Sequence, residues 1–493
     1  MRKSEVQLCT ARRKEEYYMN YEKLNDFIVM IDDMVWGVPL IVLIMAVGLL
    51  LTVRSGGIQF RCLGEGFRAM FKKTDGDGEV SSFEALCTAL SATIGTGNIV
   101  GVATAVCAGG PGALFWMVVA ACVGIATKFA ECMLAVKYRE VDANGHVLGG
   151  PFYYIEKGMG SGWKWLAKLF AIFGAAAGLL GIGTITQING ITSAVKTVFD
   201  PNFDAADPTT GLTLFGTTHS WSVVISGIIV TVLVCLVLLG GLQRIAKVAT
   251  VIVPFMAITY VVLCLTLLVF NLDKLPGALV TIVTAAFSPQ AVTGGAVGSI
   301  FVAMQKGIAR GIFSNEAGLG SAPIAAAAAQ SNDHMEQGVV SMLGTFIDTI
   351  IICMMTGLCI VITGAWNTGT DIAGAEVTAY AFQQGLPFSS TFSAFALMLC
   401  LALFAFTTIL GWDYYAERCL EYLTGGKMGP VKVYRWLYIA AVFVGPYLTV
   451  SAVWTIADIF NGLMAFPNLI ALVALSGVVA AESKKHYAAK AGK

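Results

Sequence analysis

The chain has 493 residues, of which 57% are hydrophobic and only 13% are charged. A soluble protein of this length carries far more charge on its surface, so this composition, with a mean hydropathy of +0.75, indicates an all-α polytopic membrane protein. Because its 31 basic and 31 acidic side chains cancel, the chain lacks the positive charge typical of a nucleic-acid-binding protein.

Apolar runs follow a polar amino-terminal extension at 1–35. We predict about eleven transmembrane helices, because each run is close to, or longer than, the roughly 20 residues that a helix needs to cross a bilayer. The runs lie at about 37–53, 87–108, 112–136, 165–198, 219–240, 248–270, 294–312, 337–363, 391–412, 433–450 and 454–480. The fourth is long, and we expect Gly and Asn residues to break it. The first helix and its cytoplasmic connection occupy 36–85, and a polar tail follows at 481–493.

Lysine and arginine residues gather in alternate connections, as the positive-inside rule requires of cytoplasmic loops. Examples are Arg68 after the first span, Arg418 after the ninth and Lys484 in the tail. The carboxyl end is therefore predicted to be cytoplasmic, and the protein to lie in the cell (plasma or inner) membrane. An odd number of spans puts the amino end outside, where the basic residues at 12–14 fit poorly. This conflict argues against the first predicted helix or favours a later start of translation.

Spans two to six (86–292) and seven to eleven (293–480) form two sets of five helices. Since five is odd, the second set enters the membrane from the opposite face, which is the inverted-repeat layout of many secondary transporters. Each set opens with a glycine-interrupted span, "SATIGTGNIVG" in the first and "KGIARGIFSNEAGLGSAP" in the second. Paired broken helices at equivalent positions indicate a binding site near the membrane midplane.

Unwinding at Ile94–Gly97 would release backbone groups that hydrocarbon tolerates only where they line a polar cavity. Amide N–H groups at the start of the following half-helix suit a carboxylate. Carbonyl groups on the preceding half, near Ser91 and Ile94, suit a small hard cation. One break therefore fits an amino acid and a coupling ion together. The alternative is that the glycines only allow neighbouring helices to pack closely.

Four stretches resemble the alanine or glycine:cation symporter family, namely "SATIGTGNIVG", "AGGPGALFWMVVAACVG", "GGPFYYIEKG" and "KGIARGIFSNEAGLGSAP". The resemblance runs from about Trp36 to the last helix. It implies a leucine-transporter-like core of five plus five inverted helices, with broken first helices and one extra helix at the start. It also implies inward transport of small neutral amino acids with Na+ or, in some members, with H+.

The resemblance also implies site residues. The substrate carboxylate would be held by the unwound segment, which comprises Gly95, Thr96, Gly97 and the adjacent Asn98. The sodium ion would be held by five residues with oxygen ligands: Ser91, Ile94 and Phe404 through carbonyl groups, and Thr407 and Thr408 through hydroxyl groups. The alternative for the two threonines is that they only bond back to carbonyl groups of their own helix.

Further polar and bulky residues are predicted near the substrate. Gln187 lies deep in the fourth span, where an unpaired amide is costly, and we expect it to line the cavity. For Asn189, cavity lining and helix packing both stay open. Trp412 follows the threonine pair by one turn and either caps the pocket or belongs to an interfacial aromatic belt. Met304 and Ile308 either wall the side-chain pocket or face lipid.

Ionisable residues within the spans are candidates for function. Lys128 and Glu131 lie three residues apart in the third span, and we expect them to pair. Asp348 lies nearer mid-membrane, where three roles stay open: cation binding, proton coupling, or pairing with Lys306 or Arg310. The four histidines fall in polar connections and are expected to be solvated. The twelve cysteines show no CxxC spacing that would indicate a metal site.

These features favour a symporter over other classes of membrane protein. A channel would show a filter of repeated charged or carbonyl residues, and an enzyme would show a motif such as HExxH or GxSxG in its spans. The sequence contains neither, and no enzymatic activity is predicted. We predict import of alanine and/or glycine coupled to Na+ by alternating access, with H+ as the closest alternative ion. The predicted partners are the amino acid and the lipid bilayer, without nucleic acid.

Overall fold

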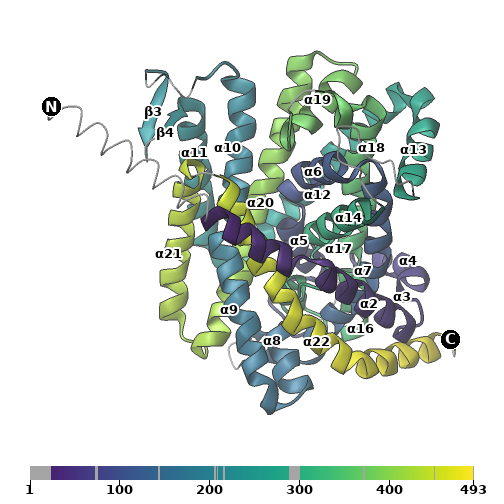
Figure 1. Cartoon of the computed structure of the whole chain (residues 1–493). Coiled ribbons are helices and arrows are strands. Elements are labelled where there is room, and N and C mark those ends of the chain that lie inside the picture. The colour runs from purple at the N-terminus through teal and green to yellow at the C-terminus, as the bar shows by residue number, and fades with distance from the viewer. Residues whose placement is uncertain are drawn as a thin grey trace.

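The computed structural model describes residues 24–72, 76–142, 145–204, 207, 209–214, 217–287, 300–369, 372–448 and 450–491, with side chains from 455 onward in the last segment. In this part of the chain, long helices pack side by side into one bundle (Figure 1). Two short antiparallel hairpins lie in connections, β1 (Glu140–Val141) with β2 (Val147–Leu148) and β3 (Gly211–Leu214) with β4 (Thr217–Ser220).

The helices of the first half precede the segment at 288–299. They are α2 (Val38–Arg54), α3 (Ile58–Arg61), α4 (Leu63–Ala69), α5 (Ser82–Thr93), η1 (Gly97–Gly101), α6 (Val102–Gly109), α7 (Gly112–Lys137), α8 (Pro151–Tyr153), η2 (Tyr154–Gly158), η3 (Ser161–Trp163), α9 (Lys164–Leu180), α10 (Ile185–Phe199), α11 (Trp221–Leu238), α12 (Gly241–Phe270), η4 (Leu272–Lys274) and α13 (Leu275–Phe287). Residues 24–35 are helical as well, so the first apolar helix begins earlier than the predicted residue 37.

The helices of the second half follow from residue 300. They are α14 (Ile300–Asn315), α15 (Ala322–Ala327), α16 (His334–Ser341), α17 (Leu343–Thr345), η5 (Phe346–Cys353), α18 (Met354–Thr363), η6 (Ala365–Asn367), α19 (Ala375–Gly385), α20 (Ser390–Thr424), α21 (Met428–Val444), η7 (Gly445–Tyr447) and α22 (Val450–Ala491). The predicted break in the fourth span is confirmed, because residues 181–184 separate α9 from α10.

Each of the eleven predicted spans overlaps a helix. By length and composition, eight helical segments of the described chain are able to cross a membrane, one of them Ser161–Phe199 with its break, and the bent pair Ser82–Thr93 and Gly97–Gly109 makes up to nine. The helices at the two remaining predicted spans are shorter, with 16 residues in α14 and 17 in α21. The chain is therefore a multi-pass membrane protein, and the count of about eleven stays a prediction.

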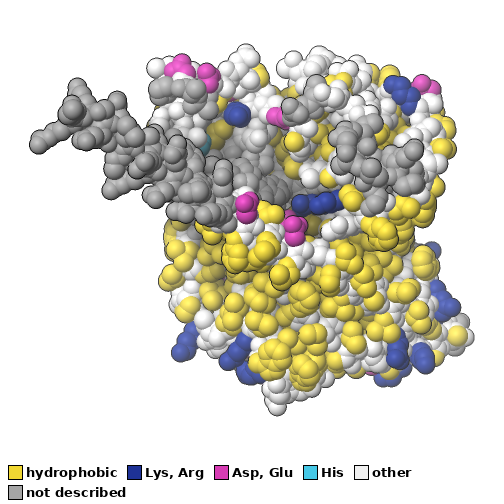
Figure 2. Space-filling view, viewed as in Figure 1, with side chains coloured by type: hydrophobic (Ala, Val, Ile, Leu, Met, Phe, Trp, Pro, Cys, Tyr) yellow, Lys and Arg dark blue, Asp and Glu magenta, His cyan; other side chains and the backbone are white. Residues whose placement is uncertain are grey.

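The outer surface of the bundle is apolar where it would meet lipid. Hydrophobic side chains cover a broad band, and Lys and Arg gather at its lower edge (Figure 2). On α11 and α12, large side chains such as Ile229, Val251 and Phe255 are more than half exposed. A soluble protein rarely exposes so large an apolar surface, so this band marks the membrane-embedded part.

Small residues bring the helices of the core into close contact. Gly307 of α14 lies against the backbone of Ala113 in α7, and a Cβ atom there would overlap the Ala113 carbonyl. Backbone-to-backbone packing of this kind is typical of membrane helices. In lipid no hydrophobic effect drives helices together, and small residues allow their backbones to approach closely enough for favourable van der Waals packing. This close packing fixes α14 beside α7. α14 also contacts the first broken helix.

A network of charged side chains joins three elements at the end of the molecule where Lys and Arg gather. His146, from the turn between β1 and β2, lies 3.0 Å from Glu79 and 2.8 Å from Glu421. Arg418 of α20 lies 2.7 Å from Glu421 and 3.3 Å from Glu79. The expectation that this histidine is solvated is therefore wrong, because the hairpin folds it onto α20.

The two carboxylates change the titration of His146. Its hydrogen bonds to Glu421 and Glu79 raise the pKa of the imidazole from 6.5 to about 9, although burial and the nearby Arg418 guanidinium oppose this shift. The same contacts hold the pKa of the Glu79 carboxyl below its ordinary value. At neutral pH His146 is therefore charged and forms ion pairs with both Glu79 and Glu421.

We expect the replacement His146→Gln to flatten the alkaline part of the stability profile. Because the pKa of His146 is higher in the folded than in the unfolded chain, its stabilisation is complete below about pH 6.5 and is lost as the pH rises through about 9. Thermal unfolding in detergent should show a melting temperature that falls over this range in the wild type and falls less in H146Q.

The matched control is His219→Gln, at the other end of the molecule on the β3–β4 hairpin. Burial lowers the pKa of His219, so this histidine is already neutral over the alkaline range and its replacement should leave the slope unchanged. Equal alkaline slopes for the wild type and H146Q would contradict the assignment.

Candidate functional site

The first broken helix is the centre of the candidate site. α5 starts with a capping box, in which Ser81 and Glu84 exchange side-chain and backbone hydrogen bonds, and it ends at Thr93. Ile94 is extended (φ −79°, ψ 93°), and helical structure resumes at Gly97 after a bend of 53°. The predicted unwinding is therefore confirmed for Ile94 and Gly95, whereas Thr96 already has helical dihedral angles (φ −58°, ψ −26°); all three residues are buried.

Side-chain amide oxygens accept hydrogen bonds from the backbone N–H groups that the break releases. Gly95 N–H donates to Asn98 Oδ1 at 2.8 Å, and Thr96 N–H donates to Gln187 Oε1 at 3.2 Å. In a continuous helix these groups would donate to carbonyls four residues back, at Ser91 and Ala92. The Ser91 carbonyl is thereby released, and two amide oxygens occupy the positions at which a substrate carboxylate was predicted to bind.

Oxygen atoms from two helices converge behind the break. Thr408 Oγ1 lies 3.2 Å from the Ile94 carbonyl oxygen and 3.0 Å from the Phe404 carbonyl oxygen. Thr407 Oγ1 lies 3.0 Å from the same Phe404 oxygen and also contacts Met256 Sδ at 3.5 Å. Ser91 is fully buried, and its hydroxyl donates to Thr88. Thr408 thus bonds back to its own helix, as the alternative held, and also reaches across to the broken helix.

Only glycine permits this contact at position 95. A Cβ atom built on Gly95 would lie 2.5 Å from Thr408 Oγ1 and 3.1 Å from Gln187 Oε1. The neighbouring Thr96 packs its methyl group against Gly190 of α10, and its buried hydroxyl has no hydrogen-bond partner among the described residues. An unpaired hydroxyl beside the released amides is available to a ligand.

The second interrupted helix packs against the first. α14 ends at Asn315, and a buried loop with Glu316, Gly318 and Gly320 at positive φ leads into α15. A Cβ atom on Gly97 would lie 3.6 Å from the ring of Phe313. The guanidinium of Arg310 lies 5.4 Å from the centroid of that ring. Sequence analysis missed Phe313 as a neighbour of the break.

The residues chosen from α14 by sequence lie earlier in that helix than the residues that contact the break. Ile308 is 3% exposed, so it does not face lipid, and Met304 is half-buried; both pack in the larger hydrophobic core. Phe313 and Ser314, about one and a half to three turns later, are the residues of α14 that lie nearest Gly97. Met304 and Ile308 therefore stay predictions as pocket walls.

Asp348 lies in the core of the site and not beside a basic residue. Its carboxylate accepts hydrogen bonds from Asn98 at 2.6 Å, Ser314 at 2.9 Å and Thr349 at 2.8 Å. The predicted alternative of pairing with Arg310 is wrong, because Arg310 instead lies 3.5 Å from Asp458 of α22. Through Asn98, Asp348 holds the broken helix against η5 and α14.

The remaining predicted residues take distinct places. Gln187 bonds the break directly, as described above. Asn189 donates to the Gly445 carbonyl at 2.9 Å and also lines a second cavity, beside Thr192 and Ser193, so it has both a packing contact and a cavity-lining position. Trp412 is fully buried and donates to Glu316 at 2.9 Å, so it does not belong to an interfacial belt.

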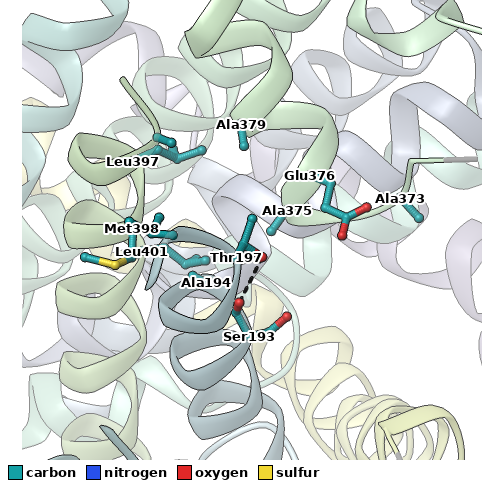
Figure 3. Close-up of a pocket in the computed structure, with 12 residues that line it drawn as sticks. Ser193, Ala194, Thr197, Ala373, Ala375, Glu376, Ala379, Leu397, Met398 and Leu401 are labelled. Carbon is teal, nitrogen blue, oxygen red and sulfur yellow. Dashed lines mark hydrogen bonds between the residues drawn. The ribbon is translucent and has the colours of Figure 1, made fainter. Parts of the chain in front are cut away.

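An outer cavity of about 240 Å³ lies between α10, α19 and α20, the first and last of which carry Gln187 and Thr408 (Figure 3). Its lining is mostly apolar, with Leu397 and Met398 from α20 and Glu376 from α19. Ser193 is six residues beyond Gln187 along α10, or about 9 Å. The cavity therefore lies on the side of the break away from the Glu79–His146 network.

A broken helix, held by polar groups inside an apolar bundle and flanked by a cavity, defines a membrane transporter. The fold agrees. The structure resembles the crystal structure of MhsT in complex with L-phenylalanine with a TM-score of 0.52, at 14% sequence identity, covering 83% of this chain and 98% of that one. The core fold is therefore that of the leucine-transporter class.

The chain belongs to the sodium:alanine symporter family, whose family model matches residues 21–493. It is 43% identical over 462 residues to the sodium/alanine symporter AgcS of Methanococcus maripaludis, covering 92% of this chain and 95% of that protein. It is 54% identical over 459 residues to an uncharacterized transporter of Haemophilus influenzae, covering 93% and 95%. A putative sodium/proton-dependent alanine carrier, YrbD of Bacillus subtilis, is 36% identical and covers 92% of this chain, 90% of its own length.

We expect Gly95→Ala to abolish most transport without unfolding the protein. The added methyl group would push Thr408 and Gln187 away from the break, an overpacking of about 1 to 3 kcal/mol that falls directly on the site. Amino-acid uptake into proteoliposomes should fall by about tenfold or more at unchanged protein incorporation.

Gly101→Ala is the matched control. Gly101 lies at the end of η1, six residues after Gly95, and a Cβ atom there meets nothing within 4 Å. Transport by G101A should stay near the wild-type rate. Equal losses in the two variants would show that the segment tolerates no alanine for reasons of helix geometry, and would remove the support for a Gly95–Thr408 contact.

Proposed function

We propose that this chain is a secondary active symporter that imports a small neutral amino acid, alanine and/or glycine, together with Na+. The observation that carries the proposal is the position of Thr408, whose hydroxyl joins the carbonyl oxygens of two helices immediately beside released amide groups. Membership of a family of alanine and cation symporters supports it. So does the name of the relative AgcS.

The proposed ion site consists of oxygen ligands without formal charge. The set comprises the carbonyl groups of Ser91, Ile94 and Phe404 and the hydroxyl groups of Thr407 and Thr408. Hard monovalent and divalent cations prefer such oxygens, and neutral ligands favour a monovalent ion such as Na+ because they supply no charge to offset a second positive one. An ion here would fasten α5 to α20.

The proposed substrate site is the adjoining side of the break. The amides of Gly95–Gly97 and the free hydroxyl of Thr96 would bind the carboxylate after Gln187 and Asn98 give up their bonds to them. Trp412, Met304 and Ile308 are proposed as walls. Because Thr408 and Gln187 both lie within about 3 Å of a Cβ position on Gly95, little space remains, which favours the smallest amino acids.

Transport is proposed to proceed by alternating access between two inverted repeats, 86–292 and 293–480. The outer cavity would admit substrate, and the Glu79–His146–Arg418 network would close the opposite side. The end that is rich in Lys and Arg is proposed to be cytoplasmic, with the carboxyl terminus, in the cell membrane. Since ion and substrate bind adjacent residues of one segment, their affinities must be linked reciprocally.

Proton coupling is the second candidate, because Asp348 is a buried carboxylate that contacts the broken helix through Asn98. The printed name of YrbD also includes a proton. Under this alternative, Asp348 would bind and release a proton during the cycle.

Uptake in proteoliposomes decides between these ions. We expect the initial rate of radiolabelled alanine uptake to rise at least about fivefold when an inward Na+ gradient replaces choline, because linked sites of this kind differ in affinity by that factor or more. Uptake that ignores Na+ but follows external acidification would overturn the sodium assignment in favour of proton coupling.

The pair Thr408→Val and Thr408→Ser tests the ion ligand. Valine keeps the shape of threonine but removes the hydroxyl, so the half-saturating Na+ concentration should rise about tenfold or more, as expected for loss of one ligand to a charge. Serine keeps the hydroxyl and should stay close to the wild type. The half-saturating alanine concentration at saturating Na+ should change less than the sodium value. A sodium value in T408V equal to that of the wild type would contradict the ligand role.

A further inference from the structure

Lys128, in the carboxyl-terminal half of α7, is a buried cation without a hydrogen-bond partner among the described residues. The residue is 2% exposed, and its ammonium makes no hydrogen bond to any described residue. The predicted pairing with Glu131 is wrong, since no ion pair joins the two residues in the described chain; Glu131 instead bonds the Gly318 N–H at 3.0 Å and Asn468 at 2.5 Å. A lysine needed only for packing would be replaced by an apolar residue without loss.

The position of Lys128 on α7 shows what its ammonium faces. Gly124, Lys128 and Glu131 follow one another at helical spacing on one stripe. A Cβ atom on Gly124 would lie 3.0 Å from Ala317, and Glu131 binds Gly318. Lys128 lies between these two contacts, so it faces the buried loop that interrupts the second helix.

Three buried carboxylates surround this loop. Glu131, Glu316 and Asp348 are each 1% exposed or less. Glu131 binds Gly318 of the loop, Glu316 is the first residue of the loop, and Asp348 binds Ser314 at the end of α14 that leads into it. No Lys, Arg or His of the described chain forms an ion pair with any of them. Glu131 Oε2 also lacks a hydrogen-bond partner there. The cluster therefore holds one fixed positive charge against three acidic groups.

The cluster is joined to the proposed transport site by direct hydrogen bonds. Glu316 accepts one from Trp412 at 2.9 Å, and Asp348 accepts one from Asn98 of the broken helix at 2.6 Å. A proton taken up by either carboxyl group would change these contacts. The charge state of the cluster therefore affects the hydrogen bonds that hold the broken helix.

We propose that Lys128 is the resident counter-cation of Glu131, Glu316 and Asp348, and that it makes transport independent of protons near neutral pH. This inference rests on the proposed sodium symport and assigns to Lys128 a positioning role that sets the choice of ion. Buried charge is tolerated only when it is balanced. Without the ammonium, the cluster must recruit a proton in its place.

Other titratable groups also face this region, and their titration would contribute to the pH dependence of transport. They are Cys132 of α7, Cys353 of η5, Tyr154 of η2, which bonds Asn468, and Tyr415 of α20. Burial keeps thiols and phenols neutral, so they do not supply the missing charge near neutral pH.

A charge-balance cycle tests the proposal with the full-length protein in proteoliposomes. The variants are Lys128→Met, Glu131→Gln and the double replacement, assayed for sodium-driven alanine uptake between about pH 5.5 and about pH 8. In K128M, uptake should fall about tenfold near neutral pH and recover on acidification, because a proton replaces the lost charge. The double variant removes one charge of each sign and should regain neutral-pH uptake to within about threefold of the wild type.

Each outcome has a fixed meaning. Rescue by Glu131→Gln, of uptake or of folding as seen by gel filtration, supports charge balance, because neutralising a side chain of nearly unchanged shape cannot repair lost packing. If K128M matches the wild type at all pH values, or if K128M and the double variant are equally impaired at all of them, the proposal is wrong. Wild-type uptake that ignores Na+ would instead count against the proposed function, and the unfolding temperatures of K128M and the double variant against pH would still test the charge balance.

Discussion

The backbone at Ile94 and Gly95 leaves its helix inside an apolar bundle, and the rest of the site follows from the need to satisfy the polar groups that this break releases. Hydrocarbon offers no hydrogen bonds, so each released N–H and C=O group must find a partner within the protein. Gln187 of α10 accepts the Thr96 N–H, and Thr408 of α20 donates to the Ile94 carbonyl. The break is therefore stable only while α10 and α20 stay beside it.

This constraint couples the two proposed ligands without any long-range mechanism. The Ile94 carbonyl and the Thr96 N–H lie on either side of Gly95 in the same short break, so a cation that fixes the first also orients the second. By linkage, a carboxylate bound to the amides must favour the cation to the same extent. The neighbouring contact of Asn98 with Asp348 extends the coupling to η5 and to α14, the second interrupted helix.

The parts of the site that could be predicted from sequence are those determined by local composition. Glycines beside hydroxyl residues in an apolar run indicate a break, and the structure has one at the expected residues. The prediction that Lys128 pairs with Glu131 is wrong because helical spacing gives no information about contacts with a loop distant in sequence. In the structure the Gly318 N–H of that loop donates to Glu131. His146 was misjudged for the same reason, since its partner Glu421 lies 275 positions away and is brought close only by the fold.

The resting contacts of the break also bear on which ligands it can accept. Gln187 and Asn98 already supply neutral amide oxygens to the released N–H groups. A ligand with only a neutral carbonyl would exchange one such bond for another and gain little. A carboxylate forms charge-assisted hydrogen bonds, which are roughly twice as strong, and so displaces the side chains at a net gain. The side-chain amides of Gln187 and Asn98 would therefore be displaced by an anionic group more readily than by a neutral one. The limited space around Gly95 would restrict the size of the ligand that carries this group.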